Sequence, residues 1–303
     1  MIPTGWRGRG GYGASPVSRL HLVGQAVRTG PLRSWCNRLV GTLGNVITEI
    51  ARARTLAADR ASFLRWSADI LAYRVLRRIR VPGHNRPRTI TLEGGVTLTY
   101  RLNRGDVLTL REVWIDEVYR LPGLSTARSL LDLGANIGLA SVWFARRYGC
   151  DRLVAVEPLP ENAVLLRHNL HQNGIAASVM ECAVGAGEGE EFLAVSREPN
   201  SGRLAREGLR VRTVSMSSVV EALGARGIAD IVKIDIEGAE EALFNGNLDW
   251  LAGVRAVIAE IHVPPVDADK VVAAMEAAGL RATSPRASSL GSEILSFSRT
   301  PPT

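Results

Sequence analysis

Hydrophobic and polar residues alternate in blocks along most of the chain. Short apolar runs bounded by turn residues predict buried strands, and apolar residues at helical spacing after each run predict helices. The predicted core strands are 130–133, 153–156, 178–182, 231–235 and 254–261. The helices predicted after them are 138–148, 160–173, 217–224, 237–244 and 267–278. This order predicts an α/β fold in which parallel strands are connected by helices on both faces of the sheet.

The two ends of this region depart from simple alternation. Strands are predicted at 280–283 and 294–297 with no helix between them, so the last pair is expected to be antiparallel, unlike a dinucleotide-binding Rossmann fold. Upstream, two strands around Gly94 and Gly95 predict a hairpin, and Asp106 is expected to cap the helix that follows. Short strands near 190–195 and 209–215 are predicted to enclose a polar insertion.

The basic charge is concentrated before residue 89. The formal charge is +7, yet only Glu49, Asp59 and Asp69 are acidic up to Arg88, and acids outnumber bases beyond it. No nucleic-acid partner is expected, because the excess charge lies outside the core region. We predict a disordered Arg/Gly-rich start, a basic helical extension broken near 55–59 and a main domain, at 1–34, 35–87 and 88–303.

The role of the basic helices stays open at this point. They could pack on the main domain, bind an anionic membrane surface or form a dimer contact. Three scattered cysteines do not make a disulfide framework, and no apolar run reaches the length of a membrane span. A cytoplasmic location is therefore expected.

Candidate chemistry begins at a glycine-rich turn after the first core strand. In Asp132-Leu-Gly-Ala-Asn-Ile-Gly138 the two glycines allow a close backbone approach, either to a ligand or only to a packed helix. Glu157 ends the next strand, where a carboxylate can accept hydrogen bonds from both hydroxyls of a ribose. Together they predict a site for an adenosine cofactor.

A second charged block ends the fourth core strand. Asp235 or Glu237 could take a proton from a hydroxyl substrate, and His262 after the fifth strand is the alternative base. Lys233 is either part of this chemistry or a structural ion pair, and Glu240 is expected to stabilise the start of a helix. Asp235, Glu237 and His262 could bind a divalent ion, but their spacing is not diagnostic, and no metal is predicted.

Three segments resemble the FkbM family of S-adenosylmethionine-dependent methyltransferases. They are Leu131-Asp-Leu-Gly-Ala-Asn-Ile-Gly138, Val156-Glu-Pro158 and Val232-Lys-Ile-Asp-Ile-Glu-Gly-Ala-Glu240, and the similarity covers about 89–298. The resemblance implies a class I methyltransferase (Rossmann-like) fold, with a mostly parallel sheet and an antiparallel last strand. It also implies O-methylation of a hydroxyl on a sugar or secondary metabolite.

The resemblance also implies a set of cofactor contacts. Residues of the glycine turn would hold the methionine part of S-adenosylmethionine, Glu157 the ribose, and the residues after the third strand the adenine. The residues concerned are Asp132, Gly134, Ala135, Asn136, Gly138, Glu157, Pro158, Cys182 and Ala183. The catalytic candidates remain Lys233, Asp235, Glu237 and His262.

Two other functions remain in competition. A nicotinamide-dependent oxidoreductase would also use Glu157 on a ribose, although the closing strand pair argues against it. A non-catalytic cofactor-binding or scaffold module could keep the fold, although the intact charged groups argue against degeneration. The leading expectation is an enzyme that methylates a small-molecule or glycosylated hydroxyl substrate.

Overall fold

The computed structural model describes most of the chain after residue 30. The described ranges are 31–74, 83–185, 187–195, 202–205, 208–224, 228–237, 239–262, 266–287 and 292–299. The predicted disordered start lies outside them up to residue 30, as do positions 196–201 of the polar insertion. The chain divides into two compact units, Met1–Gly41 and Thr42–Thr303, so the predicted domain boundaries stay predictions.

Two helices precede the main sheet. They are α1 (Pro31–Leu56) and α2 (Arg60–Arg74), and the break between them lies where the sequence predicts it. In the second unit, Val46 of α1 and Trp66 of α2 are buried in the same cluster as residues of the core helices. Within the second unit, these helices therefore pack on the main domain from residue 42 onward, while a membrane or dimer contact of the basic helices stays a prediction.

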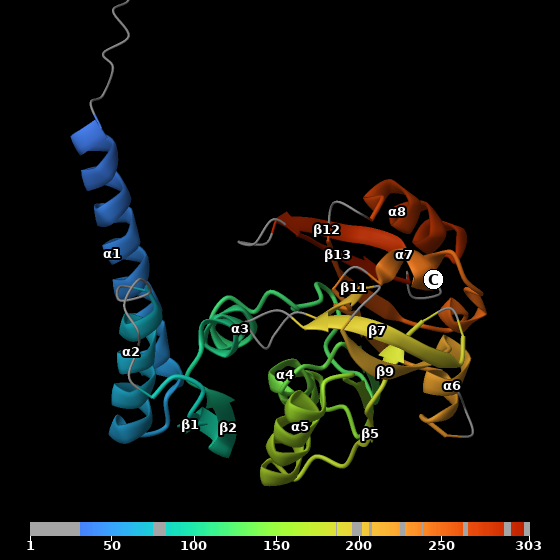
Figure 1. The fold of residues 1–303 in the computed structure, drawn as a ribbon, viewed down its shortest axis with the longest axis horizontal. Coiled ribbons are helices and arrows are strands. Elements are labelled where there is room, and N and C mark those ends of the chain that lie inside the picture. The colour runs from blue at the N-terminus through green and yellow to red at the C-terminus, as the bar shows by residue number, and fades with distance from the viewer. Residues whose placement is uncertain are drawn as a thin grey trace, which may run out of the picture. The chain divides into compact units, whose positions relative to one another are not determined.

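A seven-stranded sheet forms the centre of the second unit (Figure 1). Its order is β12 (Arg281–Ala287), β13 (Glu293–Ser298), β11 (Ala256–Ile261), β10 (Ile231–Ile234), β3 (Ser129–Leu133), β4 (Arg152–Val156) and β5 (Ser178–Met180). Strands β11, β10, β3, β4 and β5 are parallel, and β13 is antiparallel to both of its neighbours. The predicted parallel sheet with a reversed last strand is thus confirmed.

Both faces of this sheet are covered, which explains why its strands are almost continuously apolar. Leu130 enters one buried cluster and the next residue, Leu131, enters the other. Residues of α3 (Arg104–Trp114), α4 (Leu139–Tyr148) and α5 (Pro160–Gln172) belong to the first cluster. Residues of α6 (Met216–Glu221), α7 (Glu240–Phe244) and α8 (Ala268–Ala277) belong to the second.

Two smaller sheets flank the central one. The predicted hairpin is β1 (Pro87–Leu92) with β2 (Val96–Arg101). A four-stranded sheet has the order β6 (Ala183–Val184), β9 (Leu209–Val214), β7 (Gly189–Val195) and β8 (Gly202–Ala205). The single strand predicted at 178–182 was wrong. A turn in which Cys182 N donates to Met180 O (3.1 Å) ends β5, and the chain continues into the second sheet.

The predicted cap of α3 was also wrong. Asn103 caps this helix by accepting from the Asp106 backbone N–H at 2.8 Å. Asp106 is fully buried and binds the Arg101 guanidinium through both carboxylate oxygens, at 2.9 and 3.0 Å. Its acidic side chain is thus used for tertiary structure rather than for the helix terminus.

None of the helices in the described part of the chain combines the length and the apolar character needed to cross a bilayer.

Candidate functional site

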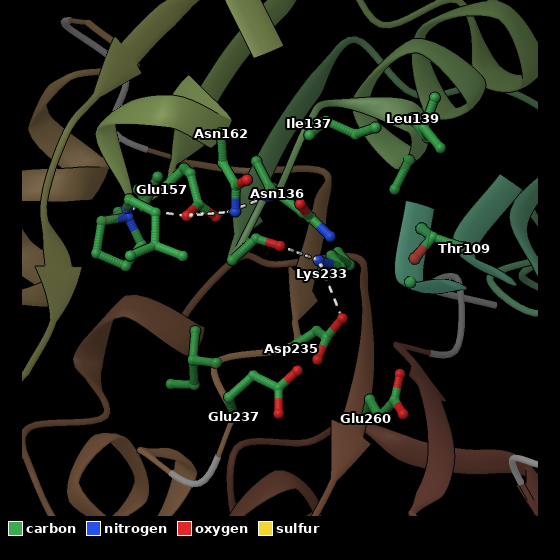
Figure 2. A pocket seen from close by; sticks show the side chains of 18 of the residues that line it. Thr109, Asn136, Ile137, Leu139, Glu157, Asn162, Lys233, Asp235, Glu237 and Glu260 are labelled. Atoms are coloured by element: carbon green, nitrogen blue, oxygen red, sulfur yellow. Dashed lines mark hydrogen bonds and ion pairs between the residues drawn. The ribbon is translucent and has the colours of Figure 1, made fainter. Parts of the chain in front are cut away.

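A cavity of about 350 Å³ opens at the carboxyl ends of the central parallel strands. Residues that follow β3, β4, β10 and β11 line it, together with side chains of α3 (Figure 2). Ligands of open α/β sheets bind at this edge, because the connections to helices on opposite faces leave a crevice there. The cavity is therefore the candidate active site.

The glycine turn after β3 is shaped by packing. Gly134 has φ +75°, and a Cβ at this position would lie 1.8 Å from the Asp235 carbonyl oxygen. Gly138 has φ +84°, and its Cβ would meet the Leu166 side chain at 2.6 Å. The sequence left open whether the glycines serve a ligand or close packing, and these contacts show that packing requires a glycine at both positions. Gly134 still lines the cavity, because the turn that it permits forms part of the wall.

Glu157 fastens this turn to the end of β4. Its carboxylate is buried and accepts from the Asn136 backbone N–H at 2.8 Å, the Leu159 N–H at 2.9 Å and the Asn162 amide at 3.2 Å. Burial raises the pKa of Glu157, and these donors together with Lys233 oppose that shift. The carboxylate is held in one orientation, with one lone pair of Oε2 left to accept from a ligand.

Lys233 is buried next to the glycine turn and forms ion pairs there. Its Nζ lies 3.1 Å from Asp132 Oδ1 and 3.6 Å from Asp235 Oδ2, and it donates to the Gly134 carbonyl oxygen at 2.7 Å. Burial lowers the pKa of Lys233, but Asp132 and Asp235 outweigh that effect and raise it. Asp132 also accepts from Ser141 Oγ at 2.5 Å. The ammonium group thus joins β3 to β10, as the structural interpretation expected.

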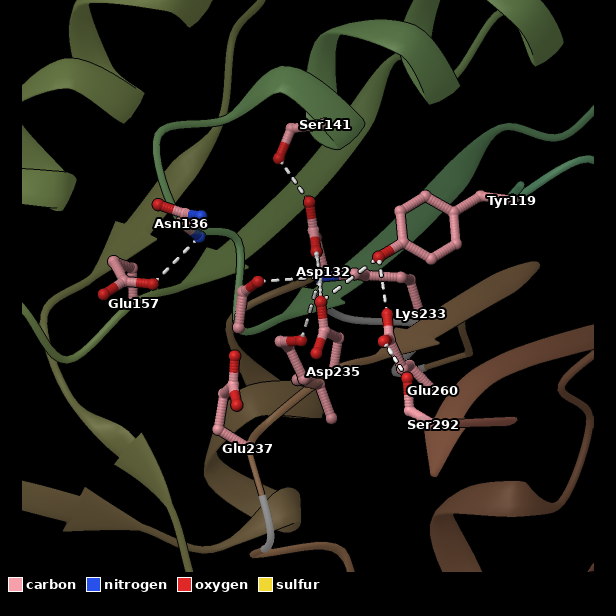
Figure 3. A network of polar contacts seen from close by, with 12 residues as sticks. Tyr119, Asp132, Asn136, Ser141, Glu157, Lys233, Asp235, Glu237, Glu260 and Ser292 are labelled. Atoms are coloured by element: carbon pink, nitrogen blue, oxygen red, sulfur yellow. Dashed lines mark hydrogen bonds and ion pairs between the residues drawn. The ribbon is translucent and has the colours of Figure 1, made fainter. Parts of the chain in front are cut away.

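A polar network continues across the cavity (Figure 3). Tyr119 Oη donates to Asp235 Oδ2 at 3.1 Å and lies 3.5 Å from Glu260 Oε2, while Ser292 Oγ donates to the other oxygen of Glu260. Burial and the nearby Asp235 charge raise the pKa of Glu260 to about 7. The carboxylates of Asp235 and Glu260, at the ends of neighbouring strands, thus both contact the Tyr119 hydroxyl group.

His262 lies between two carboxylates. Its Nδ1 is 3.0 Å from Glu240 Oε1, and its Nε2 is 3.5 Å from Glu237 Oε2. Burial lowers the pKa of His262, but the Glu240 hydrogen bond and the charges of Asp235, Glu240 and Glu237 outweigh it and raise the pKa to about 9. Glu240, expected to serve a helix terminus, is fully buried against this imidazole instead. A cationic imidazole cannot take a proton, which argues against His262 as the base.

The cavity brings together nearly all predicted site residues. The lining includes Gly134, Ala135, Asn136, Glu157, Pro158, Cys182, Ala183, Lys233, Asp235, Glu237 and His262. Asp132 and Gly138 do not line it, since Asp132 is fully buried against Lys233 and Gly138 against Leu166. These two residues support the turn from behind, and the roles of the others stay predictions.

Sequence reasoning missed Tyr119, Glu260 and Ser292. Glu260 could have been found, because it stands at the carboxyl end of β11 as Asp235 stands after β10. Tyr119 follows α3, and Ser292 immediately precedes β13, so no local pattern connects either of them to the core strands. Only the fold brings these three side chains together.

The strand order, the reversed β13 and the cavity at the carboxyl ends of β3, β4 and β10 define a class I methyltransferase fold. Residues 132–282 match the methyltransferase FkbM domain. The chain belongs to this family of methyltransferases, which argues against the nicotinamide-dependent oxidoreductase.

Several curated proteins are similar over about half of the chain. The 31-O-demethyl-FK506 methyltransferase FkbM of Streptomyces tacrolimicus is 27% identical, over 57% of this chain and 81% of its own. Methyltransferase sdnD of Sordaria araneosa is 25% identical, over 58% and 83%. The AMB antimetabolite synthetase AmbE of Pseudomonas aeruginosa is 28% identical over 50% of this chain, and the match spans only 9% of that long protein.

A solved structure of a methyltransferase FkbM from Methylobacillus flagellatus is 13% identical with a TM-score of 0.46. The match covers 85% of this chain and 60% of that one.

Proposed function

We propose that this methyltransferase transfers a methyl group from S-adenosylmethionine to a hydroxyl group of a sugar or secondary metabolite. One observation carries the proposal. The glycine turn, Glu157 and the charged residues of β10 and β11 line a single cavity, although they come from distant parts of the sequence. The name of the Streptomyces relative, a 31-O-demethyl-FK506 methyltransferase, supports a hydroxyl acceptor.

The residues present fit the cofactor. Among the described residues, Glu157 Oε2 accepts only from the Asn136 N–H, so it retains one lone pair that could accept from a ribose hydroxyl. Asn136 Oδ1 is buried and has no hydrogen-bond partner among the described residues, so it could accept from the ammonium group of the methionine part. Cys182 and Ala183 line the cavity beyond Glu157, on the side proposed for the adenine.

The charge of the cavity favours a sulfonium over a pyrophosphate. Carboxylates outnumber cationic groups in the lining, with Glu112, Glu157, Asp235, Glu237 and Glu260 against Arg104, Lys233 and His262. Lys233 is already engaged by Asp132 and Asp235. A negative wall attracts a positively charged cofactor and repels a phosphate-rich one.

Methyl transfer to an alcohol requires an aligned hydroxyl group and a route for its proton. When bound, the cofactor supplies the electrophilic methyl group. The carboxylates of Asp235 and Glu237 face the cavity and are the proposed proton acceptors (Figure 2). Tyr119 orients Asp235 through its hydrogen bond, and Lys233 fixes Asp235 relative to the glycine turn.

Acceptor choice is proposed to reside on α3. Leu108, Thr109 and Glu112 of this helix line the cavity. One apolar, one hydroxyl-bearing and one acidic side chain would suit a polyhydroxylated substrate with an apolar portion. Acceptor choice could also involve residues 196–209 and the segment after His262, of which 196–201, 206–207 and 263–265 lie outside the described residues.

Isothermal titration tests the cofactor, with S-adenosylhomocysteine and NAD as the two ligands. Binding of S-adenosylhomocysteine without binding of NAD is expected. Binding of NAD alone, or of neither ligand, would overturn the proposal, and the second result would favour a scaffold role. A screen of hydroxylated metabolites with methyl-labelled S-adenosylmethionine, read by mass spectrometry, then tests the acceptor class. Methylation at nitrogen or carbon only would contradict O-methylation.

A further inference from the structure

Asp235, Glu237 and His262 converge beside the proposed acceptor position. Each offers one ligand atom, and these atoms all lie within 4.8 Å of one another. Donor atoms bound at about 2.1 Å to one ion lie roughly 3 to 4 Å apart, so small side-chain rotations would close the set. No other such group of His, Cys, Asp and Glu occurs in the part of the chain that the structure describes.

The donor types point to a particular class of ion. Two carboxylates together with an imidazole combine the ligands preferred by Mn²⁺ and Mg²⁺ with one preferred by Zn²⁺ and Fe²⁺. The side chains are partly open to the cavity, with exposed fractions of 23% for Asp235, 30% for Glu237 and 19% for His262. Coordination positions toward the cavity would therefore remain free for water or a substrate oxygen.

Glu240 provides a second observation, independent of the three ligands. It is fully buried, and its Oε1 lies 3.0 Å from His262 Nδ1. A carboxylate on one ring nitrogen is the arrangement that fixes metal-binding histidines, since it directs the other nitrogen toward the ion. Here the other nitrogen, Nε2, faces Glu237.

The second oxygen of Glu240 has no hydrogen-bond partner among the described residues. A buried carboxylate that is only partly satisfied is costly unless a cation lies close to it. The protonated imidazole of His262, 3.0 Å away, supplies positive charge to Glu240, because Lys233 is committed to Asp132 and the Gly134 carbonyl. A divalent ion would replace the proton on Nε2 and keep positive charge next to Glu240, with Nδ1 still hydrogen-bonded to Glu240 Oε1.

We propose that Asp235, Glu237 and His262 form a binding site for a first-row divalent cation, with Glu240 as the positioning residue behind His262. The site faces the cavity, so the ion could hold an oxygen of the acceptor and lower the pKa of its hydroxyl group. The proton would pass to the carboxylate oxygen of Asp235 or Glu237 that does not bind the ion, because each of these residues offers one ligand atom. This last role rests on the proposed function, whereas ion binding does not. An acceptor with a second oxygen next to the reacting hydroxyl group could chelate such an ion.

Titration of the whole 303-residue chain with Mn²⁺, followed by electron paramagnetic resonance, tests the site. One bound Mn²⁺ is expected, with spin-echo modulation from a coordinated imidazole nitrogen that disappears in His262→Gln. Glu240→Gln keeps an acceptor for Nδ1 but removes the charge, and should weaken Mn²⁺ binding about 10- to 100-fold. Glu237→Gln removes a proposed ligand charge and should also weaken Mn²⁺ binding. It is preferred to a change at Asp235, because Asp235 also pairs with Lys233.

Glu276→Gln is the matched control, because this carboxylate is exposed on α8, outside the cavity lining. Its Mn²⁺ affinity should equal that of the wild type. The proposal is overturned if the wild type binds no Mn²⁺, or if the His262, Glu240 and Glu237 variants bind it as the wild type does. Titration of the same samples with S-adenosylhomocysteine separates the metal-site proposal from the proposed methyltransferase function. Mn²⁺ binding without cofactor binding would remove the proposed function and leave the metal site.

Discussion

The wall of the cavity at the ends of β3 and β4 differs from the wall at the ends of β10 and β11 in how its charges are balanced. At the first, Glu157 accepts three hydrogen bonds from neighbouring residues and is held in one position. At the second, Asp235, Glu237 and Glu260 converge on few positive groups. A rigid, satisfied wall suits a ligand that is the same in every turnover, whereas a wall with excess negative charge can take up protons or cations.

A substitution in the glycine turn should have the largest effect on stability and on cofactor binding. In Gly134→Ala the new Cβ would overlap the Asp235 carbonyl oxygen, which is backbone and cannot move aside easily. We expect a loss of more than about 5 kcal/mol of unfolding free energy and no binding of S-adenosylhomocysteine. Urea unfolding and calorimetry measure the two quantities.

Gly149→Ala is the matched control for that experiment. Gly149 has φ +78°, close to the +75° of Gly134, but no atom lies within 4 Å of its added Cβ. This variant should cost only the left-handed backbone strain, about 1 to 2 kcal/mol. Equal losses in both variants would show that packing against β10 does not hold the turn.

Removing Lys233 tests the connection between the two walls. Lys233→Met leaves the fully buried Asp132 without its cation, which should cost about 3 to 5 kcal/mol in urea unfolding. Adding Asp132→Asn removes the orphaned charge, so the double variant should recover part of the loss. A double variant less stable than Lys233→Met would refute the ion-pair explanation.

A pair of variants compares the walls directly. Glu157→Ala should weaken S-adenosylhomocysteine binding by about 10- to 100-fold, because it removes a charged hydrogen-bond acceptor. Asp235→Asn keeps the shape and the Tyr119 contact, so it should lower methyl transfer by about 100-fold and change cofactor affinity little. Calorimetry and product formation measure both. The division of roles fails if the two variants show the same pattern.

The smallest effect is expected at the opposite end of β3 and β10, where Asp230 accepts from the backbone N–H groups of Arg128 and Ser129 at 2.6 and 3.1 Å. Burial raises the pKa of Asp230, but these donors and Arg255 outweigh it and lower the pKa. The ionised carboxylate therefore stabilises the fold above its unfolded pKa of about 3.9, and this contribution disappears as pH falls through the lower folded value.

Asp230→Asn should accordingly cost about 1 kcal/mol at pH 7. The cost should disappear as pH falls through the lowered folded pKa of Asp230, as measured by urea unfolding over a series of acidic pH values. Asp151→Asn is the control, since Asp151 forms an exposed ion pair with Arg128. It should change stability little at any of these pH values. A pH-independent difference at Asp230 would show that shape, and not charge, stabilises the strand ends.

The sequence by itself determined the order of the core strands along the chain, the turn at Gly134 and the positions of Glu157 and Asp235 at strand ends. Each depends on local rules: apolar runs form buried strands, glycine permits a tight turn, and the ends of parallel strands meet at one edge. The end of β5 and the cap of α3 escaped those rules, because a turn at Cys182 and a buried Arg101–Asp106 pair override local preference.

Only the tertiary structure decided which charged groups become partners. Lys233 binds Asp132 across two adjacent strands, Tyr119 joins Asp235 to Glu260, and Glu240 holds His262. Such pairings join residues far apart in sequence, and a local pattern does not predict which strand ends become neighbours. Their energies depend on burial and on exact separation, which arise only when the sheet is assembled.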